Sequence, residues 1–322
     1  MDYVIAGNVM IDSVRFPDGR NSGGDHIGGP ATFAYSGVKL WTDSVMQCSN
    51  VGEDYQALFE PWMEKNRVIR DGIKVKVEHC NHSYIVFRED GTYEADMVVE
   101  RFRSDWIQDF GYMKTSPEEI GVWTKGAGVK GVYIAQNVDR VFWRQMKEIK
   151  QRDGFKLMWE IEGPSSYLKY LPEVMNALEE TDIFSINLQE ARNLFGVESE
   201  EACLEKLRGL PVDLTLFRVG ERGLYSVTRD RVWYLPPAPA DRIVDPTGCG
   251  NTSTGAALYA YAEGYDPLMV GIMANVASAQ NIRQYGIMPD MLGVRETAKA
   301  QAASLYEKYK REEHSGDMSR TF

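Results

Sequence analysis

Short apolar runs alternate with segments of helical period along most of this chain. Parallel strands that are buried on both faces appear in a sequence as continuous apolar runs, so the alternation predicts a mostly parallel sheet with helices on both sides. The predicted strands are Val4–Ala6, Val45–Cys48, Gly131–Ala135, Lys156–Ile161, Ile183–Ile186 and Leu214–Val219. The predicted helices are Ala31–Leu40, Tyr55–Lys65, Val141–Gln151, Tyr170–Glu179, Gln189–Phe195, Asn251–Glu263, Leu268–Ile282 and Thr297–Tyr309. The predicted fold class is therefore α/β, a three-layer α/β/α sandwich.

One segment interrupts this alternation. Tyr84–Phe87 and Thr92–Val99 are rich in strand-forming residues, and Arg88–Gly91 between them contains an Asp-Gly turn signal. The pattern predicts a β-hairpin. Together with the polar, glycine-rich segment 17–24, it predicts a small β flap outside the main sheet, and flaps of this kind usually cover a site. The alternative is an edge hairpin without such a role.

Charge and cysteine usage exclude several classes of protein. The 322 residues carry a net charge of -11, which is the wrong sign for a surface that binds nucleic acid or an anionic membrane. No apolar stretch is long enough to span a bilayer, and Met1–Asp12 lacks the basic region of a signal peptide. The four cysteines show no metal or redox spacing, so we expect a reducing cytoplasm.

The segment from Asp245 to Gly255 is the strongest motif in the chain. Its sequence is DPTGCGNTSTG, and it runs directly into an apolar helical segment. Glycines on both sides of one small residue at a helix start let backbone N–H groups converge where the helix dipole adds positive potential. The motif therefore predicts an anion-binding turn. The alternative is an ordinary glycine-rich turn capped by Asn251 or Thr252.

This motif resembles the C-terminal signature of the ribokinase-like (PfkB) carbohydrate and nucleoside kinases, whose usual form is D-T-x-G-A-G-D before a helix. Further segments resemble motifs of that family in the same order, and together they cover nearly the whole chain. They are Gly7–Asp12, Ile27–Thr32, Asn50–Asp54, Ile186–Glu190 and Phe217–Gly223. The predicted hairpin falls where the family carries its lid. The resemblance implies one ribokinase-like domain over 1–322, lid elements near 13–27 and 76–103, and a flexible tail at 311–322.

The resemblance implies transfer of the γ-phosphoryl group of ATP to a hydroxyl of a small sugar or nucleoside, with Mg²⁺. This chemistry needs positioning and charge neutralisation more than covalent help. The residues that the resemblance implies for acceptor binding are Asn8, Asp12, Gly28 and Gly29. Those implied for nucleotide binding are Asn187, Arg218, Gly220, Gly223 and Asn275, and the implied metal residue is Glu190, with Asn187. The implied catalytic turn comprises Asp245, Gly248, Cys249, Gly250 and Asn251. Two of these residues have a structural role as the alternative to a functional one: Glu190 suits the start of a helix, and Asp12 suits a turn. The resemblance also makes a homodimer through the β lid one arrangement to test.

Asn251 is the main departure from the family, because it stands where the family carries its catalytic Asp. A carboxamide cannot accept the acceptor's proton, and loss of a positioned base costs about 10²–10⁴-fold in rate. Three explanations are open. The chain is an impaired kinase that binds nucleotide or sugar without efficient transfer, it uses another carboxylate such as Asp245, or Asn251 is an introduced change, against which Cys249 in place of the usual Ala argues.

Two further features of the sequence bear on the site. Phe33 stands where ribokinase has polar sugar-binding residues, so the acceptor is not expected to bind as ribose does there. Gly126–Gly131 fits the G-x-G-x-x-G dinucleotide pattern but precedes a predicted strand instead of following one. A dinucleotide oxidoreductase is therefore a poor alternative.

Overall fold

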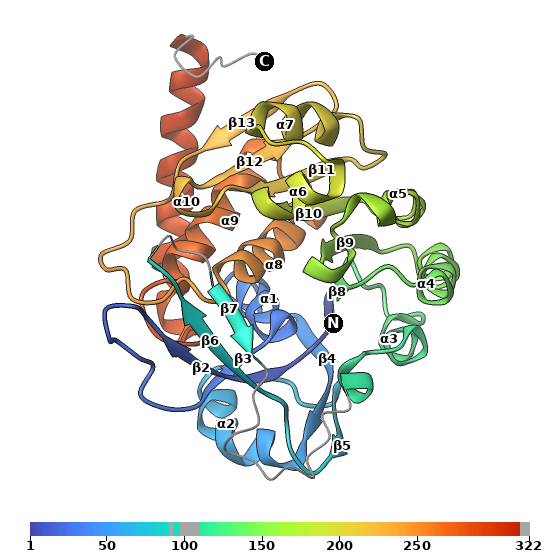
Figure 1. Cartoon of the computed structure of the whole chain (residues 1–322), viewed down its shortest axis with the longest axis vertical. Coiled ribbons are helices and arrows are strands. Elements are labelled where there is room, and N and C mark those ends of the chain that lie inside the picture. The colour runs from blue at the N-terminus through green and yellow to red at the C-terminus, as the bar shows by residue number, and fades with distance from the viewer. Residues whose placement is uncertain (90–92, 97–109, 316–322) are drawn as a thin grey trace.

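The computed structural model of the chain describes residues 1–89, 93–96 and 110–315. Its centre is a nine-stranded sheet with the strand order β13-β12-β11-β10-β9-β8-β1-β4-β5 (Figure 1). The strands are β1 (Tyr3–Ala6), β4 (Val45–Gly52), β5 (Ile73–Val77), β8 (Gly131–Gln136), β9 (Lys156–Ile161), β10 (Ile183–Asn187), β11 (Leu214–Arg218), β12 (Leu224–Val227) and β13 (Val232–Leu235). All neighbouring pairs are parallel except β11 with β12 and β12 with β13.

The direction in which the sheet grows reverses beside β1. The first half of the chain adds β4 and β5 on one side of β1, and the second half adds β8 and then β9, β10 and β11 on the other. In open α/β sheets, ligands bind outside the carboxyl ends of the strands at such a reversal. The topology alone therefore places a candidate site beyond the ends of β1 and β8.

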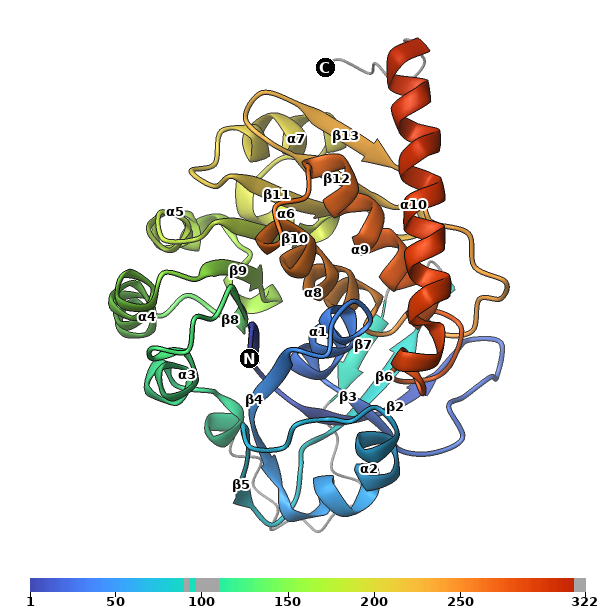
Figure 2. The same ribbon diagram turned by 180° about the vertical axis from the view of Figure 1, so that it is seen from behind.

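Helices cover both faces of the sheet, as the front and back views show (Figures 1 and 2). Those associated with one apolar core are α1 (Pro30–Lys39), α2 (Glu53–Lys65), α8 (Cys249–Ala262), α9 (Pro267–Asn281) and α10 (Met291–Ser315). Those associated with the other are α3 (Pro117–Thr124), α4 (Arg140–Asp153), α5 (Leu171–Leu178), α6 (Leu188–Phe195) and α7 (Glu200–Arg208). Short 3₁₀ turns lie at Phe110–Met113, Gly163–Ser165, Leu168–Tyr170 and Gly220–Arg222.

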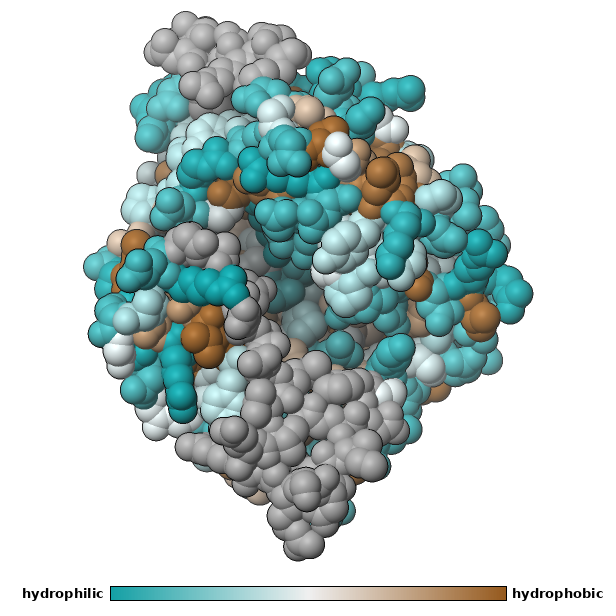
Figure 3. Space-filling model, in the orientation of Figure 1, coloured by the Kyte–Doolittle hydropathy of each residue, from teal (hydrophilic) through white to brown (hydrophobic). Residues whose placement is uncertain are grey.

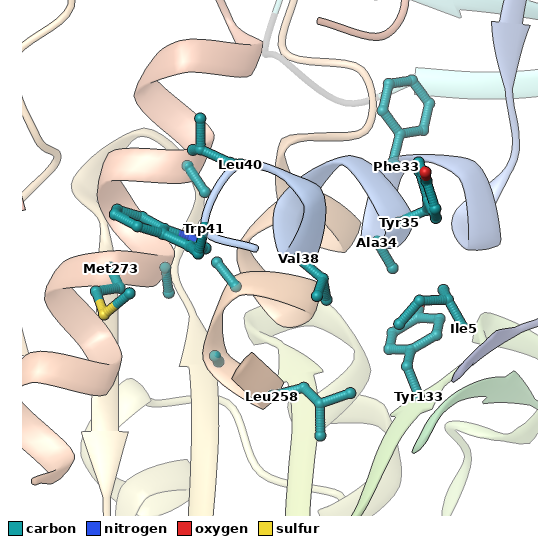
Figure 4. Packing of buried hydrophobic residues seen from close by; sticks show 14 of the residues in the cluster. Ile5, Phe33, Ala34, Tyr35, Val38, Leu40, Trp41, Tyr133, Leu258 and Met273 are labelled. Carbon is teal, nitrogen blue, oxygen red and sulfur yellow. The ribbon is translucent and has the colours of Figure 1, made fainter. Parts of the chain in front are cut away.

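The α1 helix is buried along nearly its whole length. Its side chains pack between Ile5 and Tyr133 of the sheet and the neighbouring helices (Figure 4). Because α1 begins immediately after Gly29 and packs on α8, it fixes the Gly-Gly segment next to the start of α8. Two segments far apart in sequence are thereby held at one place.

A second, four-stranded sheet forms the predicted flap. It has the order β3-β2-β6-β7, made of β2 (Met10–Arg15), β3 (His26–Gly28), β6 (His82–Phe87) and β7 (Tyr93–Asp96). The β6–β7 pair is antiparallel, which confirms the hairpin, although residues 90–92 and 97–99 of the predicted hairpin lie outside the described residues. Ile85 and Phe87 are buried against Val14 and Phe16, whereas Val86 is 42% exposed.

The structure confirms the predicted α/β architecture, every predicted strand and every predicted helix. It adds elements that the sequence analysis did not predict, namely β2, β3, β5, β12, β13, α3 and α7. Helix α10 is longer than predicted and continues through Ser315, so the described part of the predicted tail is helical. None of the described helices combines the length and apolar character that crossing a membrane requires.

Candidate active site

Polar side chains gather beyond the carboxyl ends of β1, β8, β9, β10 and β11. Asn8 follows β1, Asn137 follows β8, Glu162 follows β9, Asn187 ends β10 and Arg218 ends β11. On this face the molecule has a hollow with a largely hydrophilic lining (Figure 3). The candidate site thus lies where the topological reversal predicts it.

The glycine-rich turn enters α8 over this edge of the sheet. Gly248 is the N-cap residue with a φ of 73°, and no side chain caps the helix. The N–H group of Thr247 donates to Asp245 Oδ1 at 2.9 Å, and that of Cys249 donates to the Pro246 carbonyl at 3.1 Å. The N–H groups of Gly248, Gly250 and Asn251 have no partner within the described part of the chain. Three amides, not the unbroken run from 248 to 251, are therefore available to an anion.

Cys249 lies inside the turn as a small, partly buried side chain. Its Sγ is 3.6 Å from the Ser278 carbonyl oxygen and 3.6 Å from Asn281 Nδ2. Burial raises the pKa of the Cys249 thiol to about 12. A helix N-terminus normally lowers a thiol pKa, but here burial dominates and the thiol is not activated.

Asp245 is a buried carboxylate that accepts a hydrogen bond from the turn. Its carboxylate is 1% exposed, and Oδ2 has no hydrogen-bond partner in the described structure. Burial raises the pKa of Asp245, while hydrogen bonds from Thr247 oppose that rise. Asp245 is also close enough to Asp12 to raise the pKa of that residue.

Asp12 and the Gly-Gly segment meet on the flap side of the site. Asp12 lies in β2 opposite His26 of β3, is 3% exposed, and has an unpartnered Oδ1. A Cβ on Gly28 would come within 1.8 Å of Asp12 Oδ2, so only glycine fits beside this carboxylate. Burial raises the pKa of Asp12 to about 7, despite a backbone hydrogen bond from Gly29. Gly29 has a φ of 86° and ends the segment at the start of α1.

Asn8 lies at the rim of the site with two residues that the sequence analysis did not select. Asn137 Nδ2 donates to Glu162 Oε2 at 2.6 Å, and Asn8 Nδ2 is 3.5 Å from Glu162 Oε1. Burial, with Glu160 nearby, raises the pKa of Glu162 to about 7. A cavity lined by Asn8, Lys114 and Gln136 adjoins this rim but holds about one water molecule, too little for a substrate.

Asn187 and Glu190 begin α6 as a capping box. The Asn187 side chain accepts from the Glu190 N–H, and Glu190 Oε2 accepts from the Asn187 N–H, each at 2.9 Å. The helix-start role that the sequence left open for Glu190 is therefore confirmed. Glu190 is only 16% exposed, and burial raises its pKa to about 7 although Arg218 opposes the shift.

Arg218 forms a buried charge network with residues of two other strands. Its Nη1 is 2.9 Å from Glu160 Oε1, and its Nη2 is 3.8 Å from Glu190 Oε2. The Tyr133 hydroxyl donates to Glu160 Oε2 at 2.6 Å and also contacts the Asn251 side chain. Asn251 therefore lies beside this network.

The remaining predicted nucleotide-binding residues have local structural roles. Gly220, with a φ of 66°, and Gly223, with a φ of 102°, form the tight turn from β11 to β12. Asn275 Nδ2 donates to the carbonyls of Leu235 and Pro236 at 3.1 and 2.9 Å, which ties α9 to the end of β13. The amide hydrogens of Asn275 are thus used within the protein, whereas Gly220 and Gly223 follow Arg218 at the end of β11.

Tyr133, Asn137, Glu160 and Glu162 are the site residues that the sequence analysis missed. All four lie in or just after β8 and β9, which were predicted as strands. A search for polar residues at the carboxyl ends of predicted parallel strands would have found Asn137 and the Glu-Ile-Glu sequence of β9. Tyr133 looks like an ordinary apolar strand residue, so no such signal exists for it.

Glu190 is the residue best placed to hold a divalent cation. No group of three or more metal-ligating side chains occurs among the described residues. Mg²⁺, however, is commonly held by one or two carboxylates together with substrate phosphates and water. Glu190 is one such carboxylate, linked to the start of α8 through Arg218, which lies 3.8 Å from Glu190 Oε2 and against Gly250.

Comparisons with known proteins agree with this fold. The family model for "pfkB family carbohydrate kinase" matches residues 2–292. A cytidine kinase from Thermococcus kodakarensis is 24% identical over 273 residues, covering 82% of this chain and 90% of that protein.

Solved structures share the fold at low sequence identity. A nucleoside kinase from Burkholderia thailandensis in complex with ADP-inosine matches with a TM-score of 0.66 and 18% identity, over 92% of this chain and 95% of that one. An Arabidopsis thaliana ribokinase complexed with ribose and ATP matches with a TM-score of 0.68 and 17% identity, over 93% and 98% of the two chains. At these identities the likeness shows the fold alone.

Proposed function

The chain belongs to the pfkB family of carbohydrate kinases, and on this premise we propose that it transfers the γ-phosphoryl group of ATP to a hydroxyl group of a nucleoside or related sugar. The observation that carries the proposal is the set of unpaired N–H groups at Gly248, Gly250 and Asn251. They lie at a helix N-terminus above the carboxyl edge of the sheet, where a phosphoryl group is stabilised without any covalent step.

Asp12 is the proposed anchor for the acceptor's hydroxyl groups. Its Oδ1 is buried without a partner, and an acceptor hydroxyl would satisfy it. The glycines at 28 and 29 leave room for the Asp12 carboxylate and for the backbone of residues 8–10, and Asn8 supplies a further polar group at the rim. A nucleoside is the favoured acceptor, because the Thermococcus relative is a cytidine kinase and the Burkholderia neighbour was solved with ADP-inosine.

ATP and Mg²⁺ are the proposed donor and metal. The Arabidopsis neighbour was solved with ATP, and the turn at 220–223 lies at the end of β11 beside Arg218. Glu190 would hold Mg²⁺ through water together with the phosphates, and Asn187 would keep Glu190 in place through the capping box. When bound, the ion would neutralise charge on the phosphate oxygens.

The proton of the acceptor hydroxyl needs a destination other than Asn251. In the proposed reaction the acceptor oxygen forms a bond to the γ-phosphorus, the bond to the bridging oxygen breaks, and its electron pair leaves with ADP. We assign the released proton to Asp245, whose Oδ2 is buried and unpartnered and whose pKa is raised by burial. A raised carboxyl pKa makes a better proton acceptor near neutral pH.

The second candidate function is ligand binding without efficient transfer. Asn251 favours it, because the family's base is missing and the side chain contacts Tyr133. Loose phosphoryl-transfer transition states need little base assistance, so this substitution alone does not require an inactive protein.

One experiment separates the two functions. The protein is incubated with ATP, Mg²⁺ and a panel of nucleosides and sugars, and ADP release is compared with a reaction lacking acceptor. Asn251→Asp and Asp245→Asn are assayed in parallel. A kinase releases ADP with at least one acceptor, and Asn251→Asp raises that rate by up to about 10²-fold. If neither the wild type nor Asn251→Asp releases ADP while both bind ATP, the binding function is correct.

We also propose a homodimer through the flap sheet. Val86 on β6 is 42% exposed, whereas its neighbours Ile85 and Phe87 are buried against Val14 and Phe16. Analytical ultracentrifugation of the wild type and Val86→Lys tests this proposal. A monomer in both cases would exclude it.

A further inference from the structure

Arg218 occupies an unusual electrostatic position. Its guanidinium lies directly against the first turn of α8, since a Cβ on Gly250 would come within 2.1 Å of Arg218 Nη1. The side chain is only 14% exposed. A helix N-terminus carries partial positive charge, so a cation is normally unfavourable there and favourable at the other end. Burial strengthens that repulsion by lowering the local dielectric.

Glu160 makes this position tolerable. It is 3% exposed and uses both carboxylate oxygens, Oε1 toward Arg218 at 2.9 Å and Oε2 toward the Tyr133 hydroxyl at 2.6 Å. With both oxygens engaged, Glu160 is poorly placed to bind a ligand or to accept a proton. Its contacts instead fix the direction of the guanidinium, because Tyr133 holds the carboxylate from β8 while Arg218 reaches it from β11.

If Arg218 and Glu160 had no function, apolar side chains in their place would serve the stability of the fold as well or better, because apolar replacements for buried ion pairs are often neutral or stabilising. A costly local arrangement of this kind usually marks a functional site. The guanidinium and the unpaired amides of Gly248, Gly250 and Asn251 all present positive charge around one turn. An anion bound between the guanidinium and these amides would make this concentration of positive charge favourable.

We infer that Arg218 is a catalytic cation that contacts the phosphoryl group in transfer, and that Glu160 is the positioning residue that aims it. This inference rests on the proposed kinase function and deepens it, because Arg218 then acts on the reacting phosphate instead of only binding nucleotide. The bonds made and broken are those given above. Arg218 takes up no proton and keeps its charge, so it stabilises the oxygens as the bridging bond breaks.

The test compares Arg218→Gln, Arg218→Lys and Glu160→Gln with the wild type. Arg295→Gln is the matched control, because Arg295 of α10 is also largely buried and pairs with Asp43, which precedes β4 at the opposite edge of the sheet. Arg218→Gln is expected to lower kcat by about 10²–10³-fold with the KM for the acceptor changed less than threefold, and Arg218→Lys to recover part of the loss. Glu160→Gln is expected to lower kcat by about tenfold or more, because the cation is no longer aimed.

Non-additivity shows whether Glu160 acts through Arg218. The double variant Glu160→Gln/Arg218→Gln, which leaves no unpaired buried charge from this pair, is expected to be no slower than Arg218→Gln alone. If Glu160→Gln alone fails to fold, the rate of the double variant is still compared with that of Arg218→Gln. A double variant that is slower by the product of the two single effects would overturn the positioning role.

A binding measurement tests Arg218 without turnover. Calorimetry compares ADP alone with ADP plus aluminium fluoride, which mimics the transferring phosphoryl group. The wild type is expected to bind the mimic at least about tenfold more tightly than ADP, and Arg218→Gln to lose that difference while keeping its ADP affinity. If Arg218→Gln keeps the difference, or its kcat stays within threefold of wild type, the inference is wrong. Failure of the kinase function itself would appear separately, as no ADP release by either the wild type or Asn251→Asp.

Discussion

The ring of Phe33 fills the space beside Gly248 into which any side chain there would project. A Cβ on Gly248 would lie 2.2 Å from Phe33 Cδ1, and the residue adopts a φ of 73°. Phe33 is 2% exposed in the first turns of α1, so it is not available to an acceptor. Its role in this chain is to support the glycine-rich turn from α1.

Gly248→Ala is therefore expected to damage both the fold and the turn. The left-handed backbone costs about 1–2 kcal/mol for alanine, and the contact with Phe33 adds an overpacking cost of about 1–3 kcal/mol. The rate of ADP release should fall by about 10²-fold as the amides move. Urea unfolding and the kinase assay measure the two effects.

Gly264→Ala is the matched control for backbone strain. Gly264 has a φ of 83° just after α8 but has no atom within 4 Å of an added Cβ. It should lose stability by the strain alone and keep its activity. Equal losses for the two variants would contradict the steric role of Phe33.

The sequence predicted the sheet and its helices well because their signals are local. Gly248 was found from the glycine-rich pattern at a helix start, and Asn187 from the resemblance of its segment to a family motif. The contact between Phe33 and Gly248 could not be found in this way, because it depends on how α1 packs on α8. The same holds for Glu160 and Tyr133, whose importance arises from the pairing of strands that are distant in the chain. The short charged helix α7 escaped prediction because it has a narrow apolar face.

Asp12→Asn is expected to change the pH dependence of stability. Burial raises the pKa of Asp12 from 3.8 to about 7, so between about pH 4 and pH 7 the folded state holds a proton that the unfolded state has lost. The contribution of this residue to the free energy of unfolding is thus greatest below about pH 4 and is lost as the pH rises toward about 7. Asn has no such proton, so the variant should be more stable than the wild type at pH 8 and show a flatter profile.

The same substitution should weaken acceptor binding. An ionised carboxylate accepts hydroxyl hydrogen bonds more strongly than an amide, so the KM for the acceptor should rise by about tenfold or more at pH 8, with little change in the KM for ATP. Thermal unfolding and steady-state kinetics from pH 5 to pH 9 measure both effects. A profile for Asp12→Asn that parallels the wild type would show that Asp12 does not titrate in this range.

Cys249→Ala is expected to retain wild-type activity within about threefold, because the thiol fills a small space and its raised pKa leaves it protonated. Iodoacetamide should accordingly label the folded protein slowly at pH 7.5. Labelling followed by peptide mass spectrometry, with urea-unfolded protein as the reference, measures the rate at this residue. Rapid modification of Cys249 in the folded protein, with loss of ADP release, would indicate an activated thiol.

Glu190→Gln separates the capping role of this residue from its proposed metal role. Gln at the third helical position still completes a capping box, so stability should change by less than about 1 kcal/mol. Loss of the carboxylate should raise the Mg²⁺ concentration for half-maximal activity by about tenfold. Because burial raises the pKa of Glu190 to about 7, the wild type should need less Mg²⁺ as the pH rises through that value, and the variant should not.

The chain supplies its own control for this last prediction. Glu119 completes a second capping box with Ser116 at the start of α3. Glu119→Gln should match Glu190→Gln in its small effect on the urea midpoint but leave the Mg²⁺ requirement unchanged, because Glu119 pairs with Lys76 and Asn50, whereas Glu190 lies beside Arg218. If both variants shift the Mg²⁺ requirement equally, the effect comes from weakened helix starts. If neither shifts it, Glu190 does not hold the ion, and its contribution to this site is to begin α6 beside Arg218.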